Sequence, residues 1–345
     1  MSATSDEVAT SPWAVAAVVA MYWFVSISLV FINKILLTGA STIFFITWTQ
    51  CIVTCFICWI CGLLGEKMRR GMAETKDHEP PSKLAAFLLT FPKAEYKPAL
   101  AVKVLPLSVI FVIMILFNQL TLGLVEVSFY NVVRSLTIVC NAILSAVILK
   151  SRISFRTVCC LGIVIIGFIV GVRGEGPKRA GVVCGVVSSV AVSLNSIYTK
   201  KALSHVKNDA WLLTFNNNAN ACLLFPAIVL YFERTKLIEV TSTYDMFTPV
   251  FMGCVVMSGV LGFMIGIVTV MQIRFTSPLT HNISGTAKAA TQSALAYAYW
   301  QNEVTIMACL GIFLVLFGSS LYTAVKIWEV EKVAPTPSKA SLLPK

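Results

Sequence analysis

Charged residues are scarce in this sequence, and that scarcity excludes an ordinary soluble enzyme. Asp, Glu, Lys and Arg make up 12% of the 345 residues, whereas 57% are hydrophobic and the mean hydropathy is +0.82. Soluble chains carry about 25% charged residues. One core cannot bury so much apolar surface, so a lipid bilayer must cover much of it. About ten spans leave no room for a separate catalytic domain, and function must therefore lie among the helices.

The sequence also lacks the patterns of a disulfide framework or a metal site. Most of its 11 cysteines lie inside apolar runs, where cysteine behaves as a small hydrophobic residue. Cys51, Cys55, Cys58 and Cys61 would share one helix face, but no neighbouring group would stabilise their thiolates as metal ligands. We expect no metal and no cofactor. In a membrane protein the placement of positive charge between loops determines orientation, so we interpret the net charge of +11 in that way. We expect no nucleic-acid partner.

Long hydrophobic runs predict an all-α polytopic membrane protein with ten transmembrane helices. The predicted spans are residues 13–37, 43–64, 104–123, 127–149, 155–172, 181–203, 211–232, 249–273, 279–300 and 304–328. Residues 66–103 form the one long polar connector, and residues 1–12 and 329–345 form polar tails.

Lys and Arg are distributed unevenly between the two sets of loops. If the N-terminus is cytoplasmic, the cytoplasmic segments hold 19 of them and the opposite segments hold 6. The positive-inside rule then places both termini in the cytoplasm, as an even number of spans requires. The N-terminal segment lacks the basic region of a cleaved signal peptide, so we expect the first span to be retained.

A weak internal repeat relates the two halves of the chain. At one constant offset, Thr47, Trp48, Gln50 and Cys55 fall on Thr214, Phe215, Asn217 and Cys222. Residues 13–176 and 177–328 would each hold five helices, an odd number, so the halves would have opposite orientations. Inverted repeats are typical of alternating-access transporters, which bind their substrate between the repeats near the bilayer midplane.

Two cations, Arg134 and Lys288, lie inside predicted spans. A cation at this depth costs at least about 2.5 kcal/mol and needs an acid or a water-filled cavity. All 16 Asp and Glu fall in loops or tails, except Glu126 at the mouth of the fourth span. We therefore predict that both cations face one cavity and that an exchangeable phosphate or diphosphate neutralises them. The alternative is that each cation snorkels to the interface or caps a neighbouring helix.

Hydrogen-bonding side chains surround these cations in the sequence. Tyr130 and Asn131 precede Arg134, five polar residues lie within positions 280–286 before Lys288, and four asparagines lie between residues 216 and 220. Asparagine offers the paired donor and acceptor that suit a purine edge. The alternative is that such residues hydrogen-bond between helices.

Glycines spaced four residues apart predict close helix packing at three places. These pairs are Gly167 with Gly171, Gly181 with Gly185, and Gly262 with Gly266.

On these residues the chain resembles the nucleotide-sugar transporters of the drug/metabolite transporter superfamily, and within them the GDP-fucose transporters. The resemblance extends from Ala16 to Glu329, and residues 129–137, 213–218 and 275–289 are its most specific segments. It implies ten helices in a Golgi or ER membrane and exchange of cytosolic GDP-fucose for lumenal GMP. It also implies that the protein is not an enzyme, and it allows a homodimer.

The resemblance further implies where the substrate binds. The Phe-Tyr-Asn-Asn guanine motif of GDP-sugar carriers falls on residues 215–218, with Asn216 in place of the tyrosine. The Gly-Ala-Leu-Asn-Lys motif of GDP-mannose carriers falls on residues 284–288 and is one residue shorter from glycine to lysine, which favours fucose over mannose. The predicted substrate-binding residues are Tyr22, Asn33, Lys34, Tyr130, Asn131, Arg134, Phe215, Asn217, Asn218, Asn220, His281, Asn282, Ser284, Gly285, Thr286 and Lys288.

Roles follow from these positions. We expect Arg134 and Lys288 to hold the phosphates, Asn217 and Asn218 to read guanine, and Tyr22, Tyr130, Ser284 and Thr286 to bound the ribose or sugar. Rival interpretations are an exchanger of GDP-mannose or another phosphorylated solute, and a membrane-embedded transferase. The transferase would need an acid and base at bilayer depth, where only His281 and Glu126 are available.

Overall fold

The computed structural model describes residues 12–39, 42–74, 87–91, 93, 95–150, 153–206, 209–242, 248–275, 278–301 and 305–333, and their regular structure is helical. The helices are α1 (Pro12–Gly39), α2 (Ile43–Glu74), α4 (Pro98–Leu124), α5 (Val127–Leu149), α6 (Phe155–Glu175), α7 (Arg179–Leu203), η1 (Ser204–Val206), α8 (Ala210–Phe232), α9 (Arg234–Ser242), α10 (Pro249–Phe275), α11 (Pro278–Trp300) and α12 (Ile306–Val333).

Most of the long helices are hydrophobic enough to cross a membrane. Within the described ranges ten helices have at least 21 residues, and eight of them are long and apolar enough for a span. The other two, α8 and α11, carry the polar rows around Asn216 and Lys288. The prediction of an all-α polytopic membrane protein is therefore confirmed at this level.

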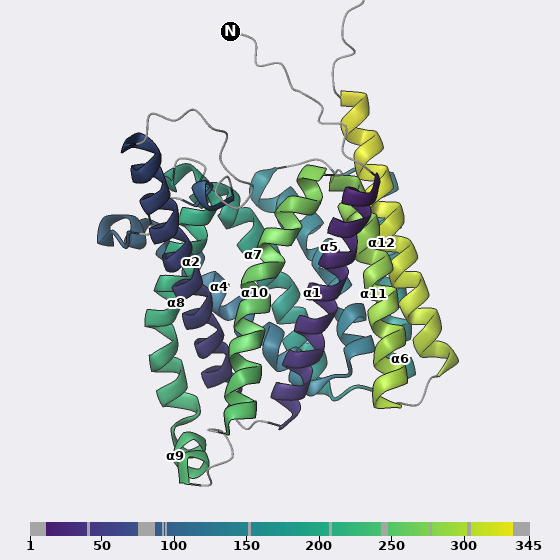
Figure 1. Cartoon of the computed structure of the whole chain (residues 1–345). Helices are drawn as coiled ribbons and strands as arrows, with labels where there is room; N and C mark the ends of the chain where they lie inside the picture. Colours follow the sequence, from purple (N-terminus) through teal and green to yellow (C-terminus); the bar gives the residue numbers. More distant parts are fainter. Residues whose placement is uncertain are drawn as a thin grey trace, which may run out of the picture.

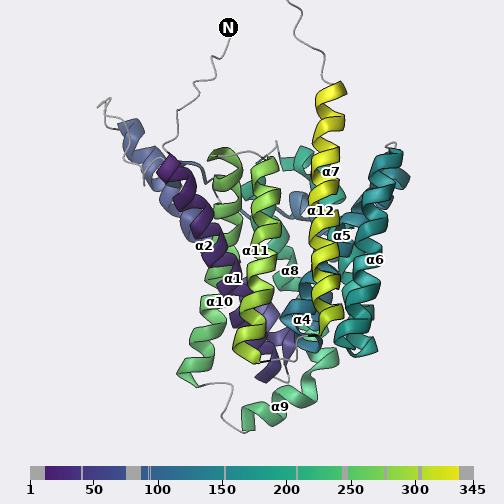
Figure 2. The ribbon, with the colours of Figure 1, turned by 90° about the vertical axis from the view of Figure 1, so that its right-hand side faces the viewer.

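The long helices form one bundle whose two ends differ (Figure 1). The start of α1 and the end of α12 lie at the same end of the bundle, together with the end of α2. The short helix α9 lies at the opposite end, as the view turned by 90° also shows (Figure 2).

Several helix ends in this bundle are fixed by polar side chains. Ser154 accepts a hydrogen bond from the Thr157 amide at the start of α6, and Asp209 accepts from two amides at the start of α8. The buried carboxylate of Glu233, which follows α8, accepts from the Phe44 and Phe45 amides at 2.9 Å each and so caps α2. These acceptors satisfy amides that a helix start leaves without partners.

Two of the three predicted glycine contacts are confirmed and the third is wrong. A methyl group added at Gly167 would lie 2.8 Å from the Val315 amide of α12, and one at Gly185 would lie 2.1 Å from Val133 of α5. These glycines therefore allow close approach of helices. A methyl group at Gly262 or Gly266 would meet nothing within 4 Å, because both residues line a cavity.

The helices extend further into the predicted connector 66–103 than hydropathy indicated. α2 continues to Glu74 and α4 begins at Pro98. Arg69 of this extension donates to the carbonyls of Leu89 and Phe91 at 3.1 and 2.9 Å. Hydropathy missed the end of α2 because its residues are charged, although its backbone is helical.

Candidate substrate cavity

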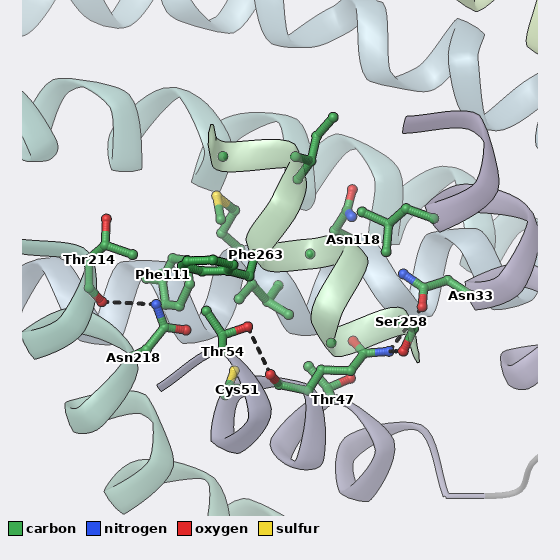
Figure 3. A pocket seen from close by; sticks show the side chains of 18 of the residues that line it. Asn33, Thr47, Cys51, Thr54, Phe111, Asn118, Thr214, Asn218, Ser258 and Phe263 are labelled. Atoms are coloured by element: carbon green, nitrogen blue, oxygen red, sulfur yellow. Dashed lines mark hydrogen bonds between the residues drawn. The ribbon is translucent and has the colours of Figure 1, made fainter. Parts of the chain in front are cut away.

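A large cavity of about 960 Å³ lies between α1, α2, α4, α8 and α10. We call it the amide lobe, because five side-chain amides line it: Asn33, Gln50, Asn118, Gln119 and Asn218. In Figure 3, Thr214 and Asn218 come from α8 on one side, Asn33 comes from α1 on the other, and Phe263 of α10 lies between them. The lining also includes Thr90, Asp209 and Trp211, so the lobe reaches the end of the bundle where α8 begins.

A second cavity of about 360 Å³ lies between α1, α5, α11 and α12. We call it the cation lobe, because Arg134 and Lys288 both line it. Val30, Tyr130 and Arg134 line both lobes, which therefore adjoin along these side chains. The sequence-based prediction that the two cations face one cavity agrees with this placement.

Neutral groups, and no carboxylate, contact the two cations within the described part of the chain. Arg134 is exposed to the lobes, and its Nη1 donates to the Tyr130 hydroxyl at 3.1 Å. Lys288 Nζ donates to Ser26 Oγ at 2.7 Å and lies 5.8 Å from the centroid of the Tyr22 ring. The ion pairs among the described residues involve neither cation. Two positive charges therefore share one lobe without a counter-charge among these residues.

A hydrogen-bonded chain of amides joins four helices at one side of the amide lobe. Gln50 Nε2 donates to Asn33 Oδ1 at 2.9 Å and to Ser258 Oγ at 2.8 Å, and Gln119 Nε2 donates to Gln50 Oε1 at 3.1 Å. Sequence reasoning missed the two glutamines as site residues. The available signal was a glutamine inside an apolar run, which needs a polar partner in a bilayer.

Helix α8 turns only part of its asparagine run toward the cavity. Trp211, Thr214 and Asn218 line the amide lobe, and their spacing of three and four residues marks one face of a helix. Phe215 and Asn217 are buried and line neither lobe. A helix of 3.6 residues per turn cannot point four consecutive side chains in one direction, so the predicted guanine motif is split.

Asn220 is also turned away from both lobes. Its Nδ2 donates to the Ala101 carbonyl and to Ser108 Oγ at 3.0 Å each, and its Oδ1 accepts from the Tyr96 hydroxyl at 3.0 Å. These bonds hold α8 against α4. The alternative of hydrogen bonding between helices therefore describes Asn220 better than substrate binding does.

Lys34 is likewise turned away from both lobes. Its Nζ donates to the carbonyls of Leu122 and Val125 at 3.0 and 2.7 Å, at the C-terminal end of α4. A cation is favourable there because the last carbonyls of a helix lack partners and carry partial negative charge. This contact is the capping role that was the alternative for the intramembrane cations. Asn33, one residue earlier, lines the amide lobe.

Helices α1, α5 and α11 supply the remaining predicted residues. Tyr22, Asn131, His281, Gly285 and Thr286 line the cation lobe.

Two of the predicted α11 residues stay apart from this set. Ser284 is buried and accepts from Trp23 Nε1 at 2.8 Å, and it lines neither lobe. The side chain of Asn282 lies outside the described part of the structure.

Asn131 fixes α5 to α11 inside the cation lobe. Its Nδ2 donates to the Ala289 carbonyl at 3.3 Å and to Ser293 Oγ at 3.0 Å, and its Oδ1 accepts from Gln292 at 3.2 Å. Arg134 and Lys288 are therefore held on two helices that are tied together.

The chain is similar in sequence to a family of transporters and to proteins that carry a name. The profile of the Triose-phosphate Transporter family matches residues 13–323. The chain is 41% identical over 333 residues to GDP-fucose transporter 1 of Mus musculus, covering 94% of this chain and 86% of the mouse protein. It is 37% identical over 324 residues to the Drosophila melanogaster protein named GDP-fucose transporter, Golgi, covering 91% of this chain and 90% of the fly protein.

One solved crystal structure shares the overall arrangement of helices. It superposes on this chain with a TM-score of 0.51 and 14% identity, and the match covers 90% of this chain and 99% of the other. At that identity the likeness concerns the fold alone.

Proposed function

The chain belongs to the Triose-phosphate Transporter family, a family of transporters rather than enzymes, and we propose that it exchanges GDP-fucose for GMP across the Golgi membrane. Its Mus musculus and Drosophila melanogaster relatives are named GDP-fucose transporters, and each match covers more than 90% of this chain. The observation that carries the proposal is the cation lobe, where Arg134 and Lys288 lack a carboxylate within the described residues.

The two lobes match the two halves of a nucleotide sugar. Guanine presents donors and acceptors along its edge, and Asn218 with the neighbouring amide-lobe residues offers both. The diphosphate carries about two negative charges, and Arg134 and Lys288 can bind it as a forked guanidinium and a compact ammonium. Tyr130 and Arg134 line both lobes, so they lie where the base site in the amide lobe meets the phosphate site in the cation lobe.

Helix packing supports the proposed inverted repeat. Under that repeat α1, α2, α4, α5 and α6 correspond to α7, α8, α10, α11 and α12. The contact of α4 with α7 then matches that of α10 with α1, and the contact of α2 with α10 matches that of α8 with α4. The two halves are not packed identically: α5 packs extensively on α7 whereas α11 barely touches α1, and α5 contacts α12 whereas α11 makes little contact with α6. Such a difference is expected of a carrier that opens to one side at a time.

We infer that the cavity opens toward the cytosolic side in this arrangement. The amide lobe reaches Asp209 at the start of α8, and α8 starts at the end of the bundle opposite α9, the end that holds the start of α1 and the end of α12 (Figure 1). That end carries most of the Lys and Arg, which supports a cytosolic assignment. At the other end, Lys34 ties α1 to the end of α4.

Exchange follows from the charges in the cation lobe. Without a bound anion, Arg134 and Lys288 repel each other in a low-dielectric site, and the rearrangement that closes the cavity is costly. GDP-fucose and GMP each bring about two negative charges and relieve the repulsion. Only a ligand that interacts differently with the two states can shift their populations, so nucleotide binding drives the return step.

Counterflow in proteoliposomes tests the proposal. Vesicles loaded with GMP should accumulate labelled GDP-fucose, and vesicles loaded with buffer should not. Unlabelled GDP-mannose, UDP-sugars and a triose phosphate are then offered as competitors. Strong competition by GDP-fucose alone supports the assignment, whereas equal competition by GDP-mannose or by the triose phosphate favours the corresponding rival exchanger. A homodimer remains a prediction.

A further inference from the structure

Helix α12 forms a wall of the cation lobe that no predicted binding residue occupies. Leu316, Ser319, Tyr322 and Thr323 line this wall, and Ile138 of α5 lines the same lobe. Their spacing of three and four residues places the α12 residues on one helix face. The lobe is therefore bounded by the cations and, on α12, by hydroxyl and apolar side chains.

Three hydroxyl groups in the lobe already use their protons within their own helices. Ser319 Oγ donates to the Val315 carbonyl at 2.7 Å, and Thr323 Oγ1 donates to the Ser319 carbonyl at 3.0 Å. Ser135 Oγ donates to the Val132 carbonyl at 2.6 Å. Because its proton is already donated, each of these hydroxyl groups can only accept a hydrogen bond from a ligand, through the lone pairs of its oxygen.

A wall of acceptors suits a sugar and does not suit a phosphate. Phosphate oxygens are themselves acceptors, so the oxygens of Ser135, Ser319 and Thr323 cannot form hydrogen bonds with them. The hydroxyl groups of a hexose are donors and complement these oxygens. The cations beside the wall bind the phosphate to which the sugar is attached.

The same wall carries apolar side chains. Leu316 and Ile138 line the lobe beside the hydroxyl groups. A 6-deoxy sugar presents a methyl group at carbon 6, whereas mannose presents a hydroxymethyl group whose oxygen would lose its water there. Burial of a polar group without a partner is unfavourable, so such a surface favours the methyl group.

We propose that Ser319, Tyr322 and Thr323 of α12, with Ser135, Ile138 and Leu316, form the subsite for the sugar ring and select a 6-deoxy hexose. This inference rests on the proposed function. It separates the two exchanged nucleotides, because GDP-fucose occupies the subsite and GMP, which has no second sugar, does not.

The experiment compares two exchange reactions in proteoliposomes for the double variant Ser319→Ala/Thr323→Val. We expect the KM for GDP-fucose in exchange for GMP to rise at least tenfold, while the KM for GMP in GMP/GMP exchange stays within about twofold. The matched control is Thr49→Val, because Thr49 makes the same kind of bond to the carbonyl four residues earlier and lines neither lobe. It should leave both KM values unchanged.

A second variant tests the apolar part of the subsite. Ile138→Thr should weaken GDP-fucose and strengthen competition by GDP-mannose, with at least a tenfold change in their ratio, while GMP/GMP exchange persists. The subsite is refuted if the α12 double variant alters GMP and GDP-fucose equally, or alters neither, and its apolar part is refuted if Ile138→Thr leaves the sugar ratio unchanged. If the wild-type protein exchanges GMP but no GDP-fucose, the proposed function fails and the inference fails with it.

Discussion

The amide lobe and the cation lobe adjoin, yet they differ in whether their polar side chains have partners within the protein. In the amide lobe, Asn33, Gln50 and Gln119 hydrogen-bond to one another and to Ser258. In the cation lobe, Arg134 and Lys288 contact neutral hydroxyl groups and have no carboxylate partner among the described residues. Most hydrogen-bonding groups of the amide lobe have partners within the protein, whereas the two charges of the cation lobe depend on a ligand for neutralisation.

This difference assigns separate tasks to the lobes. Most polar atoms of the amide network have partners within the protein, the buried Gln119 Oε1 being an exception, so the network loses little when no ligand is bound and contributes mainly to selectivity between bases. Two cations without a counter-charge are unfavourable until an anion arrives, so they contribute both affinity and the coupling of outward to inward transport. The predictions below test this division.

Loss of either cation should have the largest effect. Arg134→Ala and Lys288→Ala should each lower GMP-driven uptake of GDP-fucose at least a hundredfold, since each removes charge-assisted hydrogen bonds of about 1.5–3 kcal/mol and leaves half of a shared phosphate site. Counterflow rates, normalised to the amount of reconstituted protein, measure the effect.

Exposed Lys200 provides the matched control for these variants. Lys200→Ala should transport normally. Near-normal exchange by Arg134→Ala or Lys288→Ala in correctly folded protein would remove that residue from the phosphate site.

Two asparagines of the same run should separate selectivity from stability. Asn218→Ala should raise the KM for GMP about tenfold, equivalent to about 1.4 kcal/mol, and reduce the preference for guanine over adenine and uracil nucleotides. Asn220→Ala should leave that preference unchanged but lower the free energy of unfolding by about 1–3 kcal/mol, because Ala101, Ser108 and Tyr96 lose a partner. Competition assays and thermal melts measure the two effects, and identical behaviour of the two variants would contradict the division.

Much of the fold could be predicted from the sequence because lipid imposes a strong constraint. The predicted span 127–149 coincides with α5, and most other helix ends agree within a few residues. The exceptions occur where a helix leaves the apolar region, as α2 does at its charged end near Glu74. There hydropathy falls while backbone hydrogen bonding continues.

The site could be predicted only in part, and the reason differs between the lobes. Arg134 and Lys288 were identifiable because a buried cation is costly and therefore requires an explanation. Asn217 and Asn220 could not be separated from Asn218, because the sequence does not show which helix face meets the cavity. Ser319 on α12 gave no signal at all, since a serine that bonds to its own helix is common in membranes.

A permanent counter-charge should weaken the link between nucleotide binding and transport. Ser26 accepts from Lys288 Nζ at 2.7 Å, so Ser26→Asp places a carboxylate against that cation. We expect a severalfold to tenfold rise in net GMP efflux into nucleotide-free buffer relative to GMP/GMP exchange, because the unliganded carrier can then reorient. Efflux measured with and without external GMP gives the ratio.

The neutral variant Ser26→Asn is the control for volume and polarity. It should keep the wild-type ratio of net efflux to exchange. If Ser26→Asp also kept that ratio, repulsion between uncompensated cations would not be what prevents the unliganded carrier from reorienting.

The smallest effect on substrate should come from Lys34, a lysine near the end of α1 that, unlike Lys288, has its ammonium partners within the protein. Its ammonium is held by the Leu122 and Val125 carbonyls at the end of α4. Lys34→Met keeps the chain length and removes the charge, so the KM for GDP-fucose should stay within about twofold while the apparent melting temperature falls by a few degrees. A loss of affinity comparable to that of Lys288→Ala would mean that Lys34 reaches the substrate during the cycle, and the contrast between a ligand-dependent and a protein-satisfied cation would no longer hold.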